Sequence, residues 1–384
     1  PSGRWGRCIH FWFQTHLLMY ISFKNKRIYI LNPIMELQKY INSHPDYISE
    51  FRKLGFKVNS FKGLKIVSYR YDNPPTEEGS WQMFAKGAVI DENHKIVCLP
   101  PVKSLPYDFS GSGDYTYESL IDGTMINLFY HNEKWLISTR SEIGGYNKWQ
   151  GKKSFREMFD ECSKIDYDTL DKSMSYSFVM KHIENRNVTP IKDNELILVE
   201  VYQYIDDCIK RLTNDEYPEN NYIVNDSSID SVEFMKSYVG PVIPYYVKGF
   251  TVKCGSLRYK WINPYFDEVK NLKINMNDHL INYIELRRNG NLKKYLRYYP
   301  EHSHIFSEYK DKLHDMSNDL FTTYKNVFIH KSLEKNEIKY HLKPMIYDIH
   351  RIYLDSKEPT TWTTIKDYIH SIPSKKLVFA MNYL

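Results

Sequence analysis

Residues 117–129 of the chain read YESLIDGTMINLF. Here an acidic residue and a glycine, Asp122 and Gly123, stand at the mouth of an apolar run that is rich in strand-forming residues. The simplest interpretation is a turn that enters a strand. A second run, 135–145 (WLISTRSEIGG), ends in hydroxyls, the cation Arg140 and two glycines. Such a cluster can place backbone amides and a guanidinium against a phosphate.

Two later segments combine basic residues with strand character, namely 248–253 (KGFTVK) and 257–265 (LRYKWINPY). Because side chains alternate between the two faces of a strand, Arg258 and Lys260 share a face. Two or three cations on adjacent strands could clamp a triphosphate. The alternative is the solvated face of an amphipathic hairpin, and the segments taken alone favour it.

The length and composition predict two globular parts. The chain has 384 residues and a mass of 46.0 kDa, which exceeds one typical domain. With 42% hydrophobic and 26% charged residues it can bury a sizeable core. The net charge of +5 permits a polyanionic partner without requiring one.

The five cysteines are odd in number and far apart, and no CxxC pair occurs. This pattern argues against a zinc site or a disulfide framework, and it suits a reducing intracellular compartment. The apolar run 11–23 follows Arg4 and Arg7 and superficially resembles a signal peptide. It lacks a small-residue cleavage site and is shorter than the roughly 20 residues that span a bilayer. We therefore expect an N-terminal extension and no membrane partner.

Hydrophobic spacing divides the chain into three segments. Residues 33–55 have helical periodicity, and short strand-like runs follow, interrupted by one helical pattern at 154–164. Beyond Pro264 the patterns are helical, at residues 277–288, 292–298, 304–330, 343–354 and 365–370. We predict an extension at 1–32, a domain of antiparallel sheets at 33–267 and a helical domain at 268–384.

These pieces occur in the order of the motifs of the phage-type RNA ligases, which belong to the lysine-dependent nucleotidyltransferases, and the chain resembles that family over residues 33–270. The matching segments are 86–91 (KGAVID), 99–107 (LPPVKSLPY), 120–123 (LIDG, for the family's KxDG), 135–145, 178–188 (FV through NRNV), 248–253 and 258–260. The helical remainder is similar to the C-terminal domains of members encoded by large DNA viruses.

The resemblance implies an α+β fold: a nucleotidyltransferase (ATP-grasp-like) domain of antiparallel sheets flanked by helices, followed by an all-helical C-terminal domain. It also implies ATP and magnesium as cofactors, and a nucleotide or RNA as partner. The residues that it assigns to nucleotide binding are Lys86, Lys103, Asp122, Gly123, Arg140, Lys253, Arg258 and Lys260.

Three departures concern the family's chemistry, which begins when a lysine amine attacks the α-phosphorus of ATP. Leu120 stands at the position of that nucleophile. Val179 and Lys248 stand where the family has glutamates that orient metal, sugar and lysine. The sequence therefore gives no catalytic residue and no metal ligand with which to carry out adenylation, and it suggests a pseudoenzyme.

Three functions stay open at this point. The first is an RNA-ligase-like protein that has lost lysine adenylation and keeps a pocket for a nucleotide or an RNA end. The second is an active ATP-dependent RNA ligase with a relocated nucleophile, for which Lys103 is the candidate because no lysine occurs between Lys103 and Lys134. The third is a structural viral protein that acts as a scaffold. We expect a cytoplasmic, virus-encoded protein, with a protein partner for the helical domain.

Overall fold

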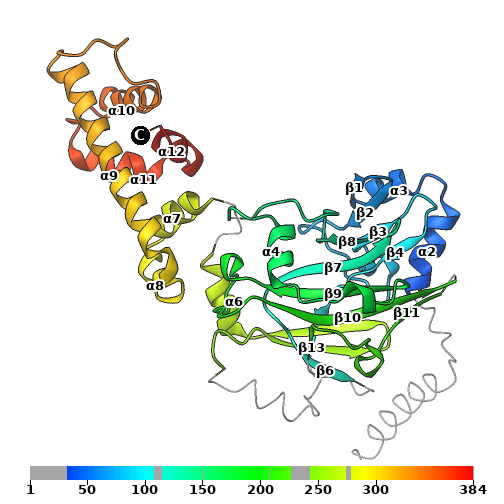
Figure 1. Cartoon of the computed structure of the whole chain (residues 1–384). Coiled ribbons are helices and arrows are strands. Elements are labelled where there is room, and N and C mark those ends of the chain that lie inside the picture. The colour runs from blue at the N-terminus through cyan, green and yellow to red at the C-terminus, as the bar shows by residue number, and fades with distance from the viewer. Residues whose placement is uncertain are drawn as a thin grey trace, which may run out of the picture.

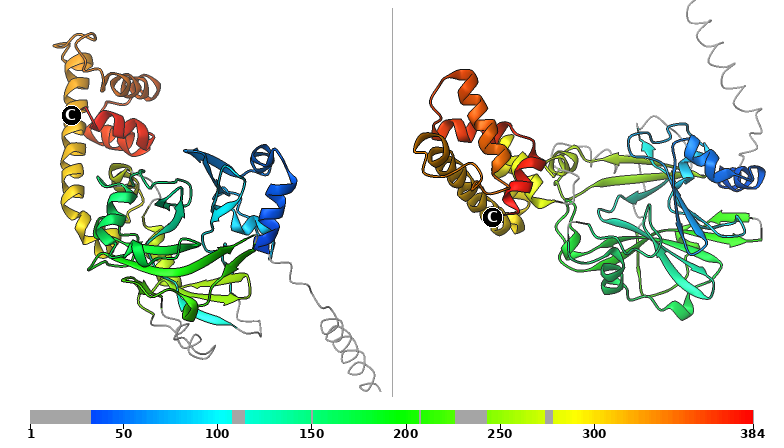
Figure 2. Two further views of the ribbon diagram at one scale, coloured as in Figure 1. Left: turned by 45° about the vertical axis from the view of Figure 1, so that its right-hand side comes forward. Right: turned by 90° about the horizontal axis from the view of Figure 1, so that it is seen from above.

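The computed structural model describes residues 33–107, 115–149, 151–206, 208–225, 243–273 and 278–383, so the extension expected at 1–32 lies outside the described residues. The described chain has an α+β architecture. Three mainly antiparallel sheets form one part, and a helical region stands to one side of them (Figure 1, Figure 2). This arrangement confirms the expected fold class of antiparallel sheets flanked by helices and followed by a C-terminal helical region.

The first sheet has the strand order β1 (Lys57–Phe61), β2 (Leu64–Ser68), β3 (Lys86–Ile90) and β4 (Ile96–Cys98), and neighbouring strands are antiparallel. Two helices, α2 (Pro33–Ser43) and α3 (Tyr47–Lys53), cover one face, as the helical spacing of residues 33–55 predicts. Leu37 and Phe51 from these helices pack with Ala88 and Ile90 of β3 in one buried cluster. The apolar faces of the two helices are therefore what closes this side of the sheet.

The second sheet has the strand order β11 (Cys208–Arg211), β10 (Glu195–Ile205), β9 (Met174–Lys181), β7 (Thr124–His131) and β8 (Lys134–Ser138), and β12 (Ile223–Val224) pairs in parallel with β10. The helix α4 (Phe155–Cys162) packs Phe159 against Tyr176 and Phe178 of β9. Ser154 and Glu157 form a capping box at its start. The helix predicted at 154–164 is thus confirmed.

The third sheet has the strand order β5 (Leu105–Pro106), β14 (Leu257–Ile262), β13 (Gly249–Cys254) and β6 (Thr116–Ser119). One face carries a buried cluster that includes Tyr117, Phe250 and Val252. The alternate residues form the opposite face, which we call the inner face. It meets the second sheet, because the ammonium of Lys253 donates a hydrogen bond of 3.1 Å to the carbonyl oxygen of Val199 on β10.

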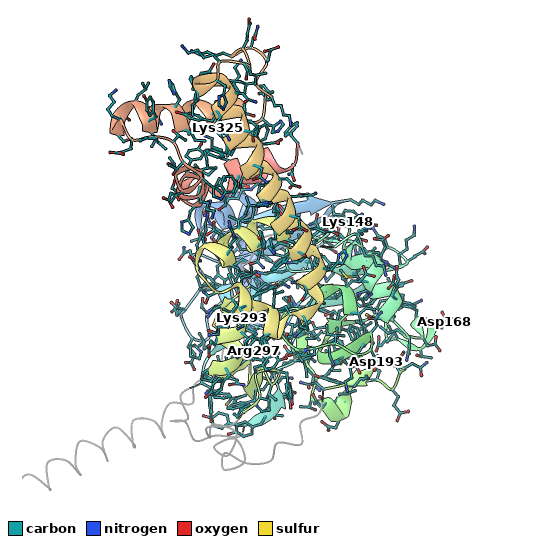
Figure 3. All side chains as sticks on the ribbon, turned by 90° about the vertical axis from the view of Figure 1, so that its left-hand side faces the viewer. Lys148, Asp168, Asp193, Lys293, Arg297 and Lys325 are labelled. Atoms are coloured by element: carbon teal, nitrogen blue, oxygen red, sulfur yellow. The ribbon has the colours of Figure 1, made fainter. Side chains whose placement is uncertain are left out.

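The C-terminal helices are α6 (Pro264–Asn271), α7 (His279–Arg288), α8 (Leu292–Tyr298), α9 (Ser303–Tyr324), α10 (Lys343–Ser356), α11 (Trp362–Ser371) and α12 (Ser374–Met381). Shorter turns of helix lie at Trp81–Phe84, Tyr167–Thr169, Ile183–Asn185, Asn214–Glu216, Pro300–His302 and, in π form, Lys325–Ile329. One buried cluster that includes Tyr295 and Phe306 holds the C-terminal helices together. Lys293 and Arg297 lie on the exposed side of α8 (Figure 3). Within the described ranges, no helix has the length and apolar character needed to cross a bilayer.

Arg186, in the loop after β9, joins the sheets to the helical region. Its guanidinium donates hydrogen bonds to the carbonyl oxygens of Val188, at 2.9 and 3.1 Å, and Tyr298, at 2.8 Å. The same group pairs with both carboxylate oxygens of Glu301 at 2.7 and 3.0 Å. Val188 itself belongs to the helical cluster. The loop after β9 is therefore fixed to the start of the helical region.

The domain boundary expected at residue 267 falls inside α6, between Phe266 and Val269, and both of these residues belong to the helical cluster. The helix α6 continues directly from β14 through Asn263, whose side chain accepts a hydrogen bond of 3.0 Å from the backbone N–H of Tyr265. Strand β14 and the helical cluster are thus joined without an intervening linker.

Replacing Arg186 by methionine should lower the free energy of unfolding by about 2–4 kcal/mol, because two carbonyl groups and a carboxylate lose their donors. Urea unfolding followed by circular dichroism measures the change. Arg156→Met is the matched control, since Arg156 pairs with Asp160 on the exposed surface of α4, and we expect a change within about 0.5 kcal/mol there. Equal destabilisation of the two variants would contradict the anchoring role.

Candidate functional site

The carboxylate of Asp122, on the connection between β6 and β7, is held by three partners. Its Oδ2 accepts hydrogen bonds of 3.0 Å from the backbone N–H groups of Val188 and Thr189. Its Oδ1 lies 3.4 Å from the ammonium of Lys248, and 6% of the Asp122 side chain is exposed. Both carboxylate oxygens are therefore engaged within the protein, and the connection is fixed against the loop after β9.

Gly123 lies directly against β9. A Cβ atom added to Gly123 would stand 2.5 Å from the carbonyl oxygen of Met180 and 2.7 Å from a methyl group of Val179. The side-chain amide of Asn187 donates a hydrogen bond of 3.2 Å to the Gly123 carbonyl oxygen. A side chain at this position would push the connection away from β9, so the glycine is required by close approach.

Leu120 extends the pairing of β6 with β13, since its backbone N–H donates a hydrogen bond of 2.9 Å to the carbonyl oxygen of Gly249. Strand alternation puts its half-buried side chain on the inner face together with Glu118. The nearby amine is that of Lys248, which donates a hydrogen bond of 3.0 Å to the carbonyl oxygen of Ile121. Burial lowers the pKa of Lys248, and the charge of Asp122 acts in the opposite direction.

Val179 sits in apolar surroundings on β9. It is 6% exposed and lies opposite Met125 of β7 on one side and Ile197 of β10 on the other. A glutamate here would lie beside Gly123, as the added-Cβ contact with the Val179 methyl group indicates. Val179 therefore packs against apolar neighbours at the position where the RNA-ligase family has a glutamate.

Four buried charged side chains form an ion-pair network between the second and third sheets. The ammonium of Lys253 lies 2.7 Å from Glu118 Oε1 and 3.6 Å from Glu200 Oε2. The guanidinium of Arg258 lies 3.0 Å from Glu200 Oε2. None of the four side chains is more than 7% exposed. Two of the predicted nucleotide-binding cations, Lys253 and Arg258, are therefore already paired with carboxylates of the protein.

The network keeps Glu200 ionised in a buried position. Although burial alone would raise its pKa, the charges of Lys253 and Arg258 bring it down to about 2. The hydroxyl of Tyr202 donates a further hydrogen bond of 2.7 Å to Glu200 Oε1. Two acids and two bases cancel each other's charge within the network, and the charge of Arg211 also acts on Glu200 from outside it.

A second group of cations gathers where the three sheets meet, and we call it the open cation group: Lys86 at the start of β3, Lys103, Arg140 after β8, and Lys260 on β14. Among the described residues, no carboxylate pairs with any member of this group. Gly87 brings β3 close to Arg140, because an added Cβ would stand 3.0 Å from the Arg140 carbonyl oxygen. Arg140 stacks on the ring of Tyr71 at 3.7 Å and donates a hydrogen bond of 2.8 Å to the carbonyl oxygen of Tyr69.

Lys86 experiences the strongest electrostatic effect in the open cation group. Withdrawal from water, together with the charges of Arg258, Lys260 and Arg140, lowers its pKa to about 7. Burial and the charges of Lys248 and other lysines also lower the pKa of Lys260. Burial lowers that of Lys103. The charge of Glu200 acts in the opposite direction on Lys86, but the neighbouring positive charges outnumber it, a condition that a bound anion would relieve.

Thr251 adds an unsatisfied hydroxyl to the same face. It lies directly opposite Lys260 in the pairing of β13 with β14, so the two side chains share the inner face. Thr251 is fully buried, and its Oγ1 has no hydrogen-bond partner in the part of the chain that the structure describes. A buried hydroxyl without a partner is costly, and a polar ligand beside Lys260 would satisfy it.

Sequence reasoning missed the two glutamates that pair with two of the six predicted cations, Lys253 and Arg258. Glu118 lies two residues before Leu120, so alternation along the strand could have put it on the same face. Glu200 carries no such signal, because it stands in an apolar run and its partner Arg258 is 58 residues away. Of the predicted residues, the structure brings Lys86, Arg140, Lys260 and Lys103 together, and Asp122 and Gly123 are in the connection next to Lys248.

The magnesium ion that the family resemblance implies does not fit these carboxylates. Mg²⁺ requires near-octahedral oxygen ligands and usually binds through one or two free carboxylates. Asp122, Glu118 and Glu200 each have both oxygens engaged by amides, hydroxyls or cations. Across the described ranges, no three His, Cys, Asp or Glu side chains come together as a metal site. Any metal here would first have to break existing ion pairs.

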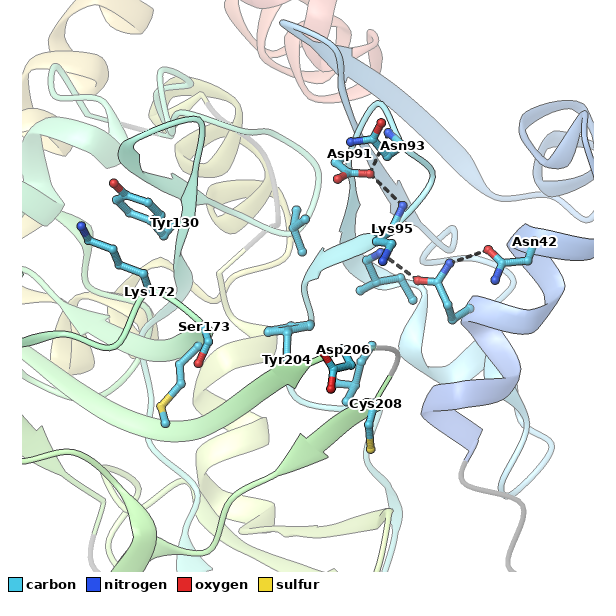
Figure 4. Close-up of a pocket in the computed structure, with 15 residues that line it drawn as sticks. Asn42, Asp91, Asn93, Lys95, Tyr130, Lys172, Ser173, Tyr204, Asp206 and Cys208 are labelled. Atoms are coloured by element: carbon cyan, nitrogen blue, oxygen red, sulfur yellow. Dashed lines mark hydrogen bonds between the residues drawn. The ribbon is translucent and has the colours of Figure 1, made fainter.

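A separate cavity of about 270 Å³ lies among α2, β4 and the hairpin of β10 and β11 (Figure 4). In the close-up, Tyr130 and Lys172 lie across from Asn42 and Lys95, and the Lys172 ammonium stands 4.9 Å from the centre of the Tyr130 ring. None of the residues predicted to bind nucleotide lines this cavity. It is therefore a different place from the open cation group.

The fold and the site define an α+β protein in which cations from three sheets converge beside a neutral, buried ion-pair network. No protein-family model matches the chain, and no curated protein matches it. Among solved structures, it is similar to a putative ATP-dependent DNA ligase from Aquifex aeolicus, with 14% identity and a TM-score of 0.38. That match covers 75% of this chain and 78% of the ligase chain.

Glu200→Gln should lower the free energy of unfolding at neutral pH by about 3–5 kcal/mol, because it leaves buried Lys253 and Arg258 without their shared partner. The pH dependence should change as well. In the folded protein the pKa of Glu200 is about 2, below the ordinary 4.5, so its contribution is complete above pH 4.5 and disappears as the pH falls toward 2. The variant should therefore lose less stability than the unaltered protein on acidification.

Urea unfolding at a series of pH values measures both effects. Asp160→Asn is the control, because Asp160 is an exposed acid paired with Arg156, and it should behave as the unaltered protein does. An identical acid dependence in Glu200→Gln and the unaltered protein would show that the network does not stabilise the fold through Glu200.

Proposed function

We propose that this chain is a nucleotidyltransferase-fold protein of the RNA-ligase type that binds a nucleotide or the phosphorylated end of an RNA and does not adenylate itself. The observation that carries the proposal is the open cation group, whose members have no carboxylate partner among the described residues while Leu120 offers no amine. Phosphate groups are anions that lysine and arginine bind well. The order of the sequence motifs supports the same class of ligand.

The loss of adenylation follows from three positions considered together. Leu120 cannot attack a phosphorus atom, Val179 offers no carboxylate, and Lys248 places an ammonium beside Asp122. Each change removes a different part of the reaction: the nucleophile, an acidic contact and a second acidic contact. The members of the open cation group, Lys86, Lys103, Arg140 and Lys260, stand at other positions of the chain, so these three changes leave them in place.

A second candidate is an ATP-dependent RNA ligase that uses Lys103 in place of Leu120. The observation in its favour is that burial lowers the pKa of Lys103, which increases the fraction of neutral amine. In that reaction the Lys103 amine would attack the α-phosphorus of ATP, form a P–N bond and release pyrophosphate and a proton. The third candidate, a scaffold, needs no ligand in the cation group at all.

Incubation with ATP labelled at the α-phosphate and with magnesium should give no acid-labile, base-stable protein adduct, because no amine stands at residue 120. Leu120→Lys alone should also give none, since Val179 and Lys248 still lack the acidic contacts. Gel electrophoresis with autoradiography measures the adduct. An adduct on the unaltered protein that disappears in Lys103→Arg would establish the second candidate and reject the proposal.

Binding of ATP or of a 5′-phosphorylated RNA should weaken as the pH rises through about 7, the pKa of Lys86 in the free protein. A bound anion favours the protonated amine, so full affinity is present below this pKa and decreases above it. Lys86→Arg should remove this dependence, because arginine stays charged. Fluorescence titration from pH 6 to pH 9 at low salt measures the affinities. Protonation of the ligand's phosphate groups affects the unaltered protein and Lys86→Arg equally, so it cancels when the two are compared.

Lys293→Arg, on the exposed side of α8, is the matched control and should leave the pH profile unchanged. A salt series completes the test, since phosphate contacts weaken as salt rises. If neither ligand binds at low salt at any of these pH values, the phosphate pocket does not exist, and the scaffold is the remaining function.

A further inference from the structure

We propose that the open cation group binds polyphosphate in its metal-free form, with Lys248 supplying positive charge that would otherwise come from a divalent cation. This inference rests on the proposed function, because it concerns the same site, and it specifies the chemical form of the ligand. Three observations carry it: the engaged carboxylates, the position of the Lys248 ammonium and the excess of cations over anions.

The acids near the site have no oxygen to spare for a metal ion. Asp122 accepts two backbone N–H groups on Oδ2 and faces Lys248 with Oδ1. Glu118 and Glu200 are locked in the buried network, where each faces Lys253. A divalent cation would need about one or two of these carboxylates, and each would leave a buried cation unpaired.

The Lys248 ammonium, by contrast, is engaged through two of its three donors, and its charge acts on Lys260. Of its three N–H donors, one is directed to the Ile121 carbonyl oxygen at 3.0 Å and one faces Asp122 Oδ1 at 3.4 Å. The ammonium also stands 5.8 Å from the centre of the Phe266 ring, and the third donor is the one that a ligand would use. Lys248 is also the first of the charged neighbours that lower the pKa of Lys260, so the two ammonium groups act on one region of the molecule.

The charge balance of the region favours the free anion over its magnesium complex. Around Lys260 the neighbouring charges are those of Lys248, Lys270, Lys103 and Arg258. Arg258 is offset by Glu200, Lys248 is partly offset by Asp122, and the Lys270 ammonium lies 3.9 Å from Asp267 Oδ1. Lys103 and Lys260 have no carboxylate partner in the described chain. A magnesium ion on the ligand cancels two of its negative charges and adds a cation near these lysines. The cations of the protein therefore replace the metal and repel it.

Isothermal titration calorimetry on the full chain tests this at low ionic strength, with ATP and inorganic tripolyphosphate as ligands, in EDTA and in excess MgCl₂. We expect the dissociation constant of each ligand to be at least about tenfold lower in EDTA than with magnesium. Equal concentrations of added ions, set with NaCl, separate the specific effect of magnesium from screening. MgCl₂ alone should give no binding heat.

Lys248→Glu should reverse the preference. The new carboxylate would stand beside Asp122, remove one cation and create an acidic pair, so binding in EDTA should fall by about tenfold or more and binding with magnesium should exceed it. Lys293→Glu makes the same charge change on the exposed side of α8 and should keep the preference for EDTA. Lys248→Gln, which removes the charge without adding an acid, provides a second variant if Lys248→Glu fails to fold.

The outcomes separate this inference from the proposed function. Tighter binding with magnesium on the unaltered protein would overturn the metal-free form and leave phosphate binding in place. Equal affinities in EDTA and magnesium, once ionic strength is matched, would also overturn it. No binding of either ligand under any condition would reject the phosphate pocket itself. Retained preference for EDTA in Lys248→Glu would exclude Lys248 as the source of the effect.

Discussion

The hydrogen bonds from the backbone N–H groups of Val188 and Thr189 to Asp122 connect the second sheet, the third sheet and the helical region. Asp122 stands between β6 and β7, which belong to different sheets, so fixing it sets the third sheet against the second. The loop that donates these bonds also contains Arg186, through which α8 is anchored. Two sheets and the helical region thus share one point of attachment, and Gly123 provides the close approach that it needs.

The predicted cations form two populations that differ in their partners. Lys253 and Arg258 are neutralised by Glu118 and Glu200, and their contribution is to join the second and third sheets. The members of the open cation group lack a carboxylate partner among the described residues, and burial together with neighbouring positive charges lowers the pKa values of Lys86 and Lys260. Lysines and arginines with similar sequence surroundings therefore have different environments in the fold. Carboxylates pair with Lys253 and Arg258 and, among the described residues, not with the open cation group.

Local patterns predicted much of the fold. The helix at 292–298 has the predicted bounds, and the common face of Arg258 and Lys260 follows from alternation along β14. Strand β9 (Met174–Lys181) was not predicted as a strand, although its apolar residues Met174, Tyr176 and Phe178 alternate with serines and share one core cluster. Helix α12 (Ser374–Met381) has about two turns and depends on tertiary packing. Which cations are neutralised depends on contacts across more than 50 residues, and sequence spacing carries no such information.

The buried ion-pair network also limits how the sequence can change. Replacing any one of its four charged residues leaves an opposite charge buried without its partner and lowers stability. Replacing both members of an ion pair by well-packed apolar side chains can leave stability nearly unchanged. The substitutions that the fold tolerates at these positions are therefore those that replace both partners of an ion pair. Glu118 and Lys253 should vary together in related sequences, as should Glu200 and Arg258. Such covariation would reveal the two contacts from sequences alone.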